Sequence, residues 1–250
     1  MYSFEGKTVF VTGSSTGIGK ATAIAFAQHG ADVIIHYNSS VHEAEKVKGE
    51  IEKLERRSLL LQGDVSDSQQ VNKMVEKIKE EFGTIDVLVN NAGSMVRRSR
   101  LEDLDEGLWD QVIEVNLKSV YLVTRATLPL LKKTKGKIIN VTSIAASNGG
   151  GIDSVAYATS KGGVSTLTKA LAKDLVEYHI NVNALSPGVI STPFHDRHTS
   201  AEKRQNAVKT IPMGREGTPE ETVGATLYLA SDYAAYVTGQ IIEVNGGQLM

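Results

Sequence analysis

Tyr157 and Lys161 are the pair of residues in this sequence best suited to chemistry, because they lie four positions apart. On a helix this spacing puts both side chains on one face, one turn apart. A lysine ammonium beside a phenol favours the phenolate and so lowers the tyrosine pKa from its reference value of about 10. The tyrosine would then act as a general acid or base near neutral pH. Such pairs also arise by chance in ordinary helices, so the meaning of this one depends on the elements that position it.

Three glycines, Gly13, Gly17 and Gly19, lie between the β-branched run 8–12 and the alanine-rich segment 20–29. The run predicts a buried strand, and the segment predicts a helix. Glycines at such a junction permit a tight turn and the close approach of a pyrophosphate, whose negative charge the helix N-terminus favours. A plain glycine-rich turn is the alternative. The position of the loop, after the first strand and before its helix, favours dinucleotide binding.

Strand-like and helix-like segments alternate along the whole chain. We expect strands at 8–12, 32–37, 59–61, 85–90, 137–141, 180–185 and 241–244, and helices at 20–29, 41–57, from a cap at Ser66 or Asp67 to 81, at 105–133 with a bend or frayed turn at Pro129, at 153–178 and at 219–230. This order is typical of βα units. It predicts one doubly wound α/β domain (a Rossmann fold) over residues 1–250, with a parallel sheet of about seven strands and helices on both faces. The less regular stretch 187–218 contains the expected substrate loop, about 190–217.

The composition argues against several classes of protein. The sequence has 27 basic and 29 acidic residues, a net charge of −2 and no long run of either sign, so nothing suggests a nucleic-acid or membrane partner. It contains no cysteine, which rules out disulfides and thiolate catalysis, and no tight His/Asp cluster that would bind a metal. The first residues lack the apolar core of a signal peptide, and no run approaches the roughly 18 apolar residues of a membrane span. We therefore expect a soluble cytoplasmic protein without a metal site.

Several motifs occur together in the order and at the spacings of one family. Thr12–Gly19 resembles the T-G-x-x-x-G-x-G loop of the classical short-chain dehydrogenases/reductases, Asn90–Gly93 resembles the N-N-A-G motif, Tyr157–Lys161 resembles Y-x-x-x-K, Asn116 and Ser143 match the other catalytic positions, and Pro187-Gly188 matches the P-G after the sixth strand. Agreement of independent motifs over essentially the whole chain is far more specific than any single motif. The resemblance implies hydride transfer between nicotinamide C4 and a carbonyl or alcohol carbon.

The predicted catalytic residues are Asn116, Ser143, Tyr157 and Lys161. Tyr157 would donate a proton to the developing alkoxide, and Ser143, just past a strand, would hydrogen-bond the substrate oxygen. By resemblance, Lys161 also holds the nicotinamide ribose, and the backbone carbonyl of Asn116 holds a water that relays protons. An ordinary strand-end hydroxyl at Ser143 and a packed helix residue at Asn116 are the alternatives.

The end of the second predicted strand bears on the choice of cofactor. An acid there would bond the ribose 2′-hydroxyl and repel a 2′-phosphate, but the chain has Tyr37, Asn38 and Ser39. We expect a preference for NADP, with NAD possible because no Arg or Lys follows the strand. The resemblance assigns the cofactor to Gly13, Ser15, Thr16, Gly17, Ile18, Gly19, Tyr37, Asn38, Ser39, Asp64, Val65, Asn91, Ala92, Gly93, Tyr157, Lys161, Pro187, Gly188, Ile190 and Thr192.

Two substrate classes remain open. The general pattern resembles the 3-oxoacyl-carrier-protein reductases, and the basic cluster 132–137 could dock an acyl carrier protein, although positive charge near a helix end also suits the helix dipole. The polar segment 194–200 fits a sugar or polyol better. Arg97–Arg100, near the predicted cleft, could meet an anionic substrate.

The most specific prediction is an NADP(H)-preferring 3-oxoacyl thioester reductase, with a sugar or polyol dehydrogenase as the alternative. A catalytically silent, cofactor-binding regulator is a hypothesis from another class. It predicts a broken catalytic set, whereas all four residues are present. The resemblance also implies a homotetramer. The apolar residues of the tail 244–250 would pack either on a partner or on their own domain.

Overall fold

The computed structural model describes residues 2–250, which fold around one seven-stranded sheet. The strands are β1 (Thr8–Val11), β2 (Asp32–Tyr37), β3 (Ser58–Gln62), β4 (Val87–Asn90), β5 (Lys137–Val141), β6 (Asn181–Pro187) and β7 (Ile241–Val244). All neighbouring strands are parallel, in the order β3-β2-β1-β4-β5-β6-β7. The strand order reverses between β1 and β4, so that pair forms the switch point of a doubly wound sheet. The predicted fold class is confirmed.

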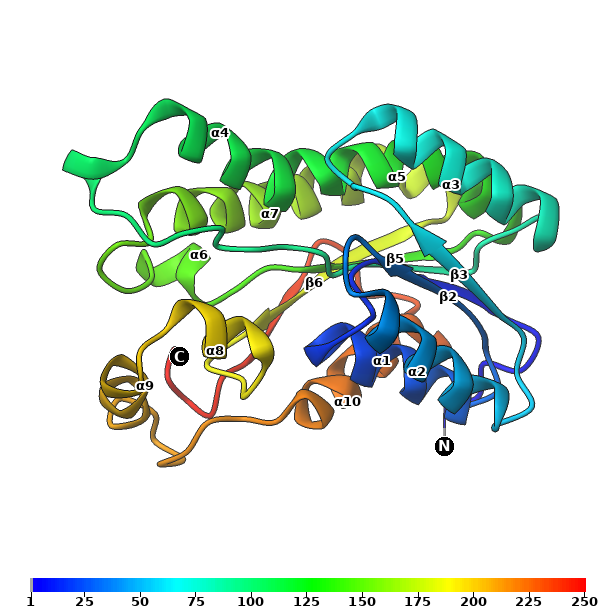
Figure 1. The fold of residues 1–250 in the computed structure, drawn as a ribbon. Helices are drawn as coiled ribbons and strands as arrows, with labels where there is room; N and C mark the ends of the chain where they lie inside the picture. The colour runs from blue at the N-terminus through cyan, green and yellow to red at the C-terminus, as the bar shows by residue number, and fades with distance from the viewer. Residues whose placement is uncertain (1) are drawn as a thin grey trace.

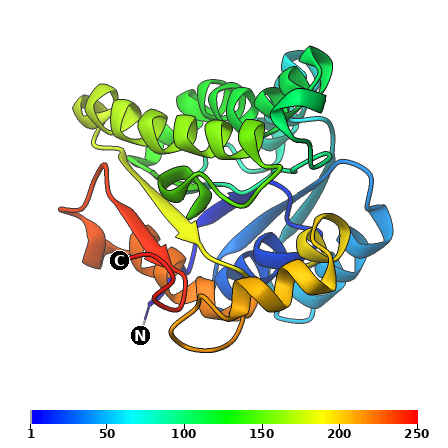
Figure 2. The same cartoon turned by 90° about the vertical axis from the view of Figure 1, so that its left-hand side faces the viewer.

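Helices cover both faces of the sheet (Figure 1). They are α1 (Gly17–Gln28), α2 (Val41–Glu52), α3 (Ser68–Glu81), α4 (Glu106–Ile113), a π-helical turn η2 (Glu114–Lys118), α5 (Ser119–Thr134), α6 (Ala145–Asn148), α7 (Val155–Asp174), α8 (Pro193–His198), α9 (Ala201–Val208) and α10 (Pro219–Ala230), with short 3-10 turns η1 (Leu101–Asp103), η3 (Val176–Tyr178) and η4 (Asp232–Ala234). Helices α3, α5 and α7 lie on one face and α1, α2 and α10 on the other. Figure 2 shows α8 and α9 in front of the carboxyl ends of the strands.

The core consists of two layers of apolar side chains, one on each side of the sheet. Successive residues of a strand point to opposite faces, so Val9 packs with Phe26 of α1 on one side, whereas Phe10 packs with Leu131 of α5 on the other. Strands buried on both faces must be apolar at nearly every position. This requirement explains why short β-branched runs predicted the strands well. Among residues 2–250, no helix combines the length and apolarity needed to cross a membrane.

Capping residues set several helix starts. The Asp67 carboxylate accepts hydrogen bonds from the backbone N–H groups of Gln69 and Gln70, as the sequence predicted for α3. At α10, Thr218 and Glu221 form a capping box, and Pro219 occupies the first helical position.

Several predicted elements differ from the structure. The helix expected at 153–178 ends at Asp174, before the 3-10 turn η3, and the strand expected at 85–90 begins at Val87. The helix expected at 105–133 is split by the π turn η2, after which α5 continues through Pro129 without a break. The helix expected at 41–57 ends at Glu52, and Glu55 has a positive φ of 58°, which is incompatible with a continuing right-handed helix. The stretch expected to be irregular, 187–218, contains the two short helices α8 and α9.

Candidate active site

The loops after β1 and β4 are tied together at the switch point. The Thr12 hydroxyl accepts hydrogen bonds from the backbone N–H groups of Asn91 and Ala92, both at 3.0 Å. The Asn91 side-chain amide donates in return to the carbonyls of Thr12 and Gly13, at 2.9 and 3.0 Å. These reciprocal bonds hold the glycine loop against the N-N-A-G segment, so both motifs contribute to one surface.

The glycines of this loop have no room for side chains. A Cβ at Gly13, where φ is +63°, would lie 2.9 Å from the Ala92 Cα, and a Cβ at Gly19 would lie 2.3 Å from the Gly13 carbonyl oxygen. Gly17, with φ of +56°, begins α1. A tight, Cβ-free turn at a helix N-terminus is the geometry that binds a pyrophosphate, so the residues present fit a dinucleotide.

His36 completes the support of the glycine loop, and the sequence analysis did not identify it. Its Nδ1 accepts a hydrogen bond from the Gly13 N–H at 2.9 Å, and its Nε2 lies 2.9 Å from the Gly63 carbonyl oxygen. Nε2 therefore carries the proton and the imidazole is neutral. Burial lowers the pKa of His36, against the smaller, raising effects of the Gly63 bond and the Asp64 charge. A polar residue inside the apolar strand 32–37 was the signal that could have revealed it.

A cavity of about 790 Å³ opens at the carboxyl ends of the strands and contains every residue predicted to bind the cofactor. The loop after β2, with Tyr37, Asn38 and Ser39, lines one end together with Asp64 and Val65. The Asp64 carboxylate accepts hydrogen bonds from the backbone and hydroxyl of Ser66. Pro187, Gly188, Ile190 and Thr192 line the cavity on the side of β6.

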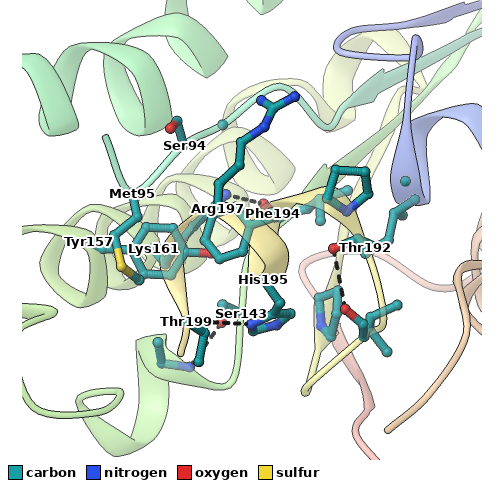
Figure 3. Close-up of a pocket in the computed structure, with 18 of the residues that line it drawn as sticks. Ser94, Met95, Ser143, Tyr157, Lys161, Thr192, Phe194, His195, Arg197 and Thr199 are labelled. Atoms are coloured by element: carbon teal, nitrogen blue, oxygen red, sulfur yellow. Dashed lines mark hydrogen bonds between the residues drawn. The ribbon is translucent and has the colours of Figure 1, made fainter. Parts of the chain in front are cut away.

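Ser143, Tyr157 and Lys161 line the same cavity (Figure 3). Ser143 lies two residues beyond the end of β5, and the other two lie on the first two turns of α7. The Lys161 ammonium is buried and donates to the Val141 carbonyl at 2.8 Å. The structure therefore brings three of the four predicted catalytic side chains to the cavity that the glycine loop lines. This loop, with Gly13, Gly17 and Gly19, is called the glycine cradle below.

The expected effect of Lys161 on Tyr157 is wrong for this structure. Burial penalises the phenolate and raises the pKa of Tyr157 to about 12, while the Ser143 hydroxyl and the Arg98 charge act weakly in the opposite direction. Lys161 makes its hydrogen bond to Val141 instead, and burial lowers its own pKa to about 8. Helical spacing predicted the neighbourhood of the two groups, but the desolvation of the phenol determines its acidity.

Asn116 does not line the cavity but supports its wall from inside the π turn. Its side-chain oxygen accepts from the Ser94 N–H at 3.1 Å, and its amide donates to the carbonyls of Ser94 and Val112, at 2.6 and 2.9 Å. A Cβ on Gly93 would lie 2.7 Å from the Asn116 Oδ1 and 3.3 Å from the Lys161 Nζ. Gly93 thus allows Asn116 and Lys161 to approach the same point. The expected carbonyl-to-water relay stays a prediction.

Helices α8 and α9 form the remaining wall. The Phe194 ring lies 5.6 Å from the Tyr157 ring and contacts the His195 and His198 rings edge-on. Lys203 of α9 is 2.8 Å from the Asp153 carboxylate, which precedes α7. No group of three His, Asp or Glu side chains within residues 2–250 is arranged to hold a metal ion.

A Rossmann sheet, a glycine cradle at its switch point and a Ser-Tyr-Lys cluster beside it define a nicotinamide-dependent oxidoreductase. The family model described as "Enoyl-(Acyl carrier protein) reductase" matches residues 13–248. A 3-oxoacyl-[acyl-carrier-protein] reductase FabG of Thermotoga maritima is 42% identical, over 97% of this chain and 98% of its own. The L-rhamnose 1-dehydrogenase (NAD(P)(+)) of Sphingomonas sp. is 40% identical, over 99% and 98%.

Solved structures agree with these relatives. A short-chain type dehydrogenase/reductase from Mycobacterium marinum superposes with a TM-score of 0.93 at 34% identity, covering 98% of this chain and 96% of its own. The NADH-dependent reductase A1-R′ responsible for alginate metabolism gives a TM-score of 0.91 at 32% identity, covering 99% and 98%. The chain belongs to the short-chain dehydrogenase/reductase family and is an NAD(P)-dependent dehydrogenase/reductase.

Proposed function

We propose that this enzyme transfers a hydride between NADP(H) and the carbonyl or secondary-alcohol carbon of a small, polar substrate. The observation that carries the proposal is the meeting of Ser143, Tyr157 and Lys161 with the glycine cradle in one cavity. A complete set of these residues also argues against a silent, cofactor-binding regulator.

In the reduction of a carbonyl, Ser143, Tyr157 and Lys161 have different functions. The bound nicotinamide supplies the hydride. The Ser143 hydroxyl hydrogen-bonds the substrate oxygen, and Tyr157 donates its phenolic proton to that oxygen as negative charge develops. With a pKa of about 12, Tyr157 is protonated at neutral pH and ready to donate. The Lys161 ammonium, charged below about pH 8, would hold the ribose hydroxyls of the cofactor.

The preference for NADP(H) rests on the loop after β2. Tyr37, Asn38 and Ser39 line the cavity and carry no negative charge that would repel a 2′-phosphate. Fluorescence titration with NADPH and NADH tests the preference. Tighter binding of NADPH supports it, and tighter binding of NADH contradicts it.

A polar substrate is favoured by the wall opposite the cradle. Ser94, Arg98, Asn148, His195 and Thr199 contribute polar groups to that end of the cavity. The L-rhamnose 1-dehydrogenase relative, named for a sugar substrate, agrees with such a wall.

A 3-oxoacyl thioester is the second candidate, supported by the FabG relatives. The basic cluster 132–137 does not add support, because it lies where α5 ends and β5 begins. The cavity lies at the other end of β5, about 16 Å away for a five-residue strand. Within the cluster, Lys132 stacks 3.4 Å from the centre of the Tyr178 ring and Lys133 donates to the Gly83 carbonyl. These contacts indicate a structural function for the cluster rather than docking of a carrier protein.

Steady-state assays with sugars, polyols, short oxo compounds and 3-oxoacyl esters, each with both cofactors, separate the two candidates. The largest kcat/KM for polar compounds supports the first, whereas the largest kcat/KM for 3-oxoacyl esters supports the second. No turnover of any carbonyl or alcohol would contradict both.

We also propose a homotetramer located in the cytoplasm. The exposed apolar side chains of Tyr121 on α5 and Val155 on α7, 47% and 40% exposed, offer surfaces that assembly would bury. Sedimentation velocity at micromolar concentration tests the assembly, and a single monomeric species would contradict it.

A further inference from the structure

Arg98 differs from Lys203 and Arg204, the cations of the cavity that pair with carboxylates, in how its side chain is bound. Its guanidinium is half-buried and donates to the His198 carbonyl, to the Thr199 hydroxyl at 3.1 Å and to the Ile152 carbonyl at 3.4 Å. A guanidinium has five N–H groups, so two remain. Arg98 and the catalytic Tyr157 line the same cavity.

Within residues 2–250, no carboxylate oxygen lies within 4.0 Å of the Arg98 guanidinium. Asp153 is the acid whose charge acts on it, but the Asp153 carboxylate is already 2.8 Å from the Lys203 ammonium. Burial lowers the pKa of Arg98 more than Asp153 raises it. A partly desolvated charge held by neutral groups alone is costly. The site therefore lacks an anion.

The wall around Arg98 is positive as well. Arg197 of α8 lines the same cavity next to Phe194 (Figure 3), and no ion pair forms at it in the described part of the chain. Burial lowers the pKa of His198, and the charges of Arg98 and Arg197 lower it further.

The acids whose charges act on this wall are already paired: Asp153 with Lys203, and Asp196 and Glu216 with Arg204. Asp64 is the only acid among the described residues that line the cavity. It follows β3, whereas Ser143 follows β5, four strands away in the sheet order. At the usual strand spacing this separation is about 19 Å. Among the described residues, Arg98 and Arg197 thus have no carboxylate oxygen within 4.0 Å, whereas Lys203 and Arg204 of the same cavity are paired.

From this geometry we propose that Arg98 binds a carboxylate of the substrate, so that the enzyme acts on oxo acids or the matching hydroxy acids, sugar acids included. The inference rests on the proposed function and deepens it by naming the substrate class. A guanidinium and a carboxylate pair through two parallel hydrogen bonds, and two N–H groups remain on Arg98. Because Arg98, Ser143 and Tyr157 line one cavity, one small molecule can contact all three.

A purely structural function for Arg98 has a different signature. Its present acceptors are two carbonyls and a hydroxyl on the segments around α7 and α8, which any neutral donor of the right length would also satisfy. Loss of the guanidinium would then weaken every substrate alike. Loss of an anion site would weaken only the charged ones.

The test compares oxo acids of three to six carbons with their methyl esters, and a hexuronic acid with the parent hexose, using the full chain and NADP(H). We expect wild-type kcat/KM to be at least about 30-fold larger for the best acid than for its uncharged partner. Arg98→Gln should remove most of this ratio, and Arg98→Lys should retain part of it. Arg100→Gln is the matched control, since it removes one charge from the same segment at an exposed residue that does not line the cavity.

The possible results separate this inference from the proposed function. An equal loss for acid and ester in Arg98→Gln, or a wild-type preference for uncharged substrates, overturns the carboxylate site but leaves hydride transfer intact. If no compound is turned over, the proposed function fails, and calorimetric titration of the oxo acids still decides the inference. Binding weakened at least about tenfold by Arg98→Gln supports the site, and unchanged or undetectable binding overturns it.

Discussion

The Lys161 ammonium nitrogen lies 2.8 Å from the carbonyl oxygen of Val141, the last residue of β5, and 5.8 Å from the centre of the Tyr157 ring. The strand therefore holds the lysine, and α7 holds the tyrosine beside it. Since Ser143 follows the same strand, the end of β5 positions both the cation and the hydroxyl of the site.

Replacement of the phenol tests the general acid. We expect Tyr157→Phe to lower kcat for carbonyl reduction by about 10³-fold, because the variant has no proton to donate to the substrate oxygen. The Kd of NADPH should rise by no more than about fivefold, the cost of one lost hydrogen bond. Stopped-flow oxidation of NADPH measures the first quantity and fluorescence titration the second. Reduction at a near-normal rate would remove Tyr157 from the mechanism.

The pH dependence of carbonyl reduction should reflect the protonation state of Lys161. Burial lowers its pKa from 10.5 to about 8, so its ammonium loses its proton at a lower pH than that of an exposed lysine. We expect kcat/KM for reduction to be constant below about pH 8 and to fall by about tenfold per unit above it. Any activity retained by Lys161→Arg should lack this fall, because arginine stays charged. A wild-type profile that is flat to pH 10 would be inconsistent with the buried ammonium.

His36 should affect both cofactor binding and acid stability. His36→Leu leaves the Gly13 N–H and the Gly63 carbonyl without partners, and we expect the Kd of NADPH to rise by about tenfold. His36→Asn retains an acceptor for the Gly13 N–H and should recover much of the binding. If the leucine variant binds NADPH normally, the imidazole does not position the loop.

The stability of the protein in acid follows from the direction in which folding shifts the pKa of His36. The folded-state pKa lies below 6.5, so below pH 6.5 the unfolded chain takes up a proton that the folded chain does not. The free energy of unfolding should therefore fall as the pH falls below 6.5, and His36→Leu should lose that part of the dependence. Urea unfolding at pH 7 and pH 5 measures the difference, and identical pH dependence in both proteins would argue against it.

Two glycine substitutions contrast the cradle with an ordinary helix surface. Gly19→Ala puts a methyl group 2.3 Å from the Gly13 carbonyl oxygen, so we expect the Kd of NADPH to rise more than about tenfold as the loop shifts. Gly49 lies inside α2, and a Cβ added there would meet no atom of a neighbouring element within 4 Å. Gly49→Ala should therefore stabilise the protein by about 0.5–1 kcal/mol without affecting the binding of NADPH. Calorimetric titration and thermal unfolding measure the two effects. Equal binding by both variants would show that the cradle tolerates a side chain.

Most of the fold could be predicted because the inner strands of the sheet are buried on both faces. The bounds of β2, β5 and β7 match the predicted ranges, since apolar runs between turns have few other interpretations. Short polar helices such as α9 and the interruption at η2 left no comparable signal in the pattern. A π turn contains only one residue more than an α turn, and this difference barely alters the hydrophobic periodicity. The sequence therefore predicted a single helix over 105–133.

The candidate site was predictable as a set of residues but not in its electrostatics. Motif spacing located Ser143, Tyr157 and Lys161 at one cavity. The pKa of Tyr157 depends on how much water the fold removes from the phenol, and no spacing contains that information. The contacts of His36 and Arg98 join segments far apart in the chain, so they became visible only once the sheet and α8 were in place.

The π turn at Glu114–Lys118 has a consequence for how this chain tolerates insertions and deletions. A π turn accommodates one residue more than an α turn, and each residue of an α-helix adds about 100° of rotation. Deleting one residue of 114–118 would restore a continuous α-helix, but it would rotate α4 and everything attached to it relative to α5. Asn116 would turn away from Ser94. The extra residue of the π turn therefore sets the rotation of Asn116 toward the active site. We expect insertions and deletions to be tolerated in the surface loops but not within 114–118.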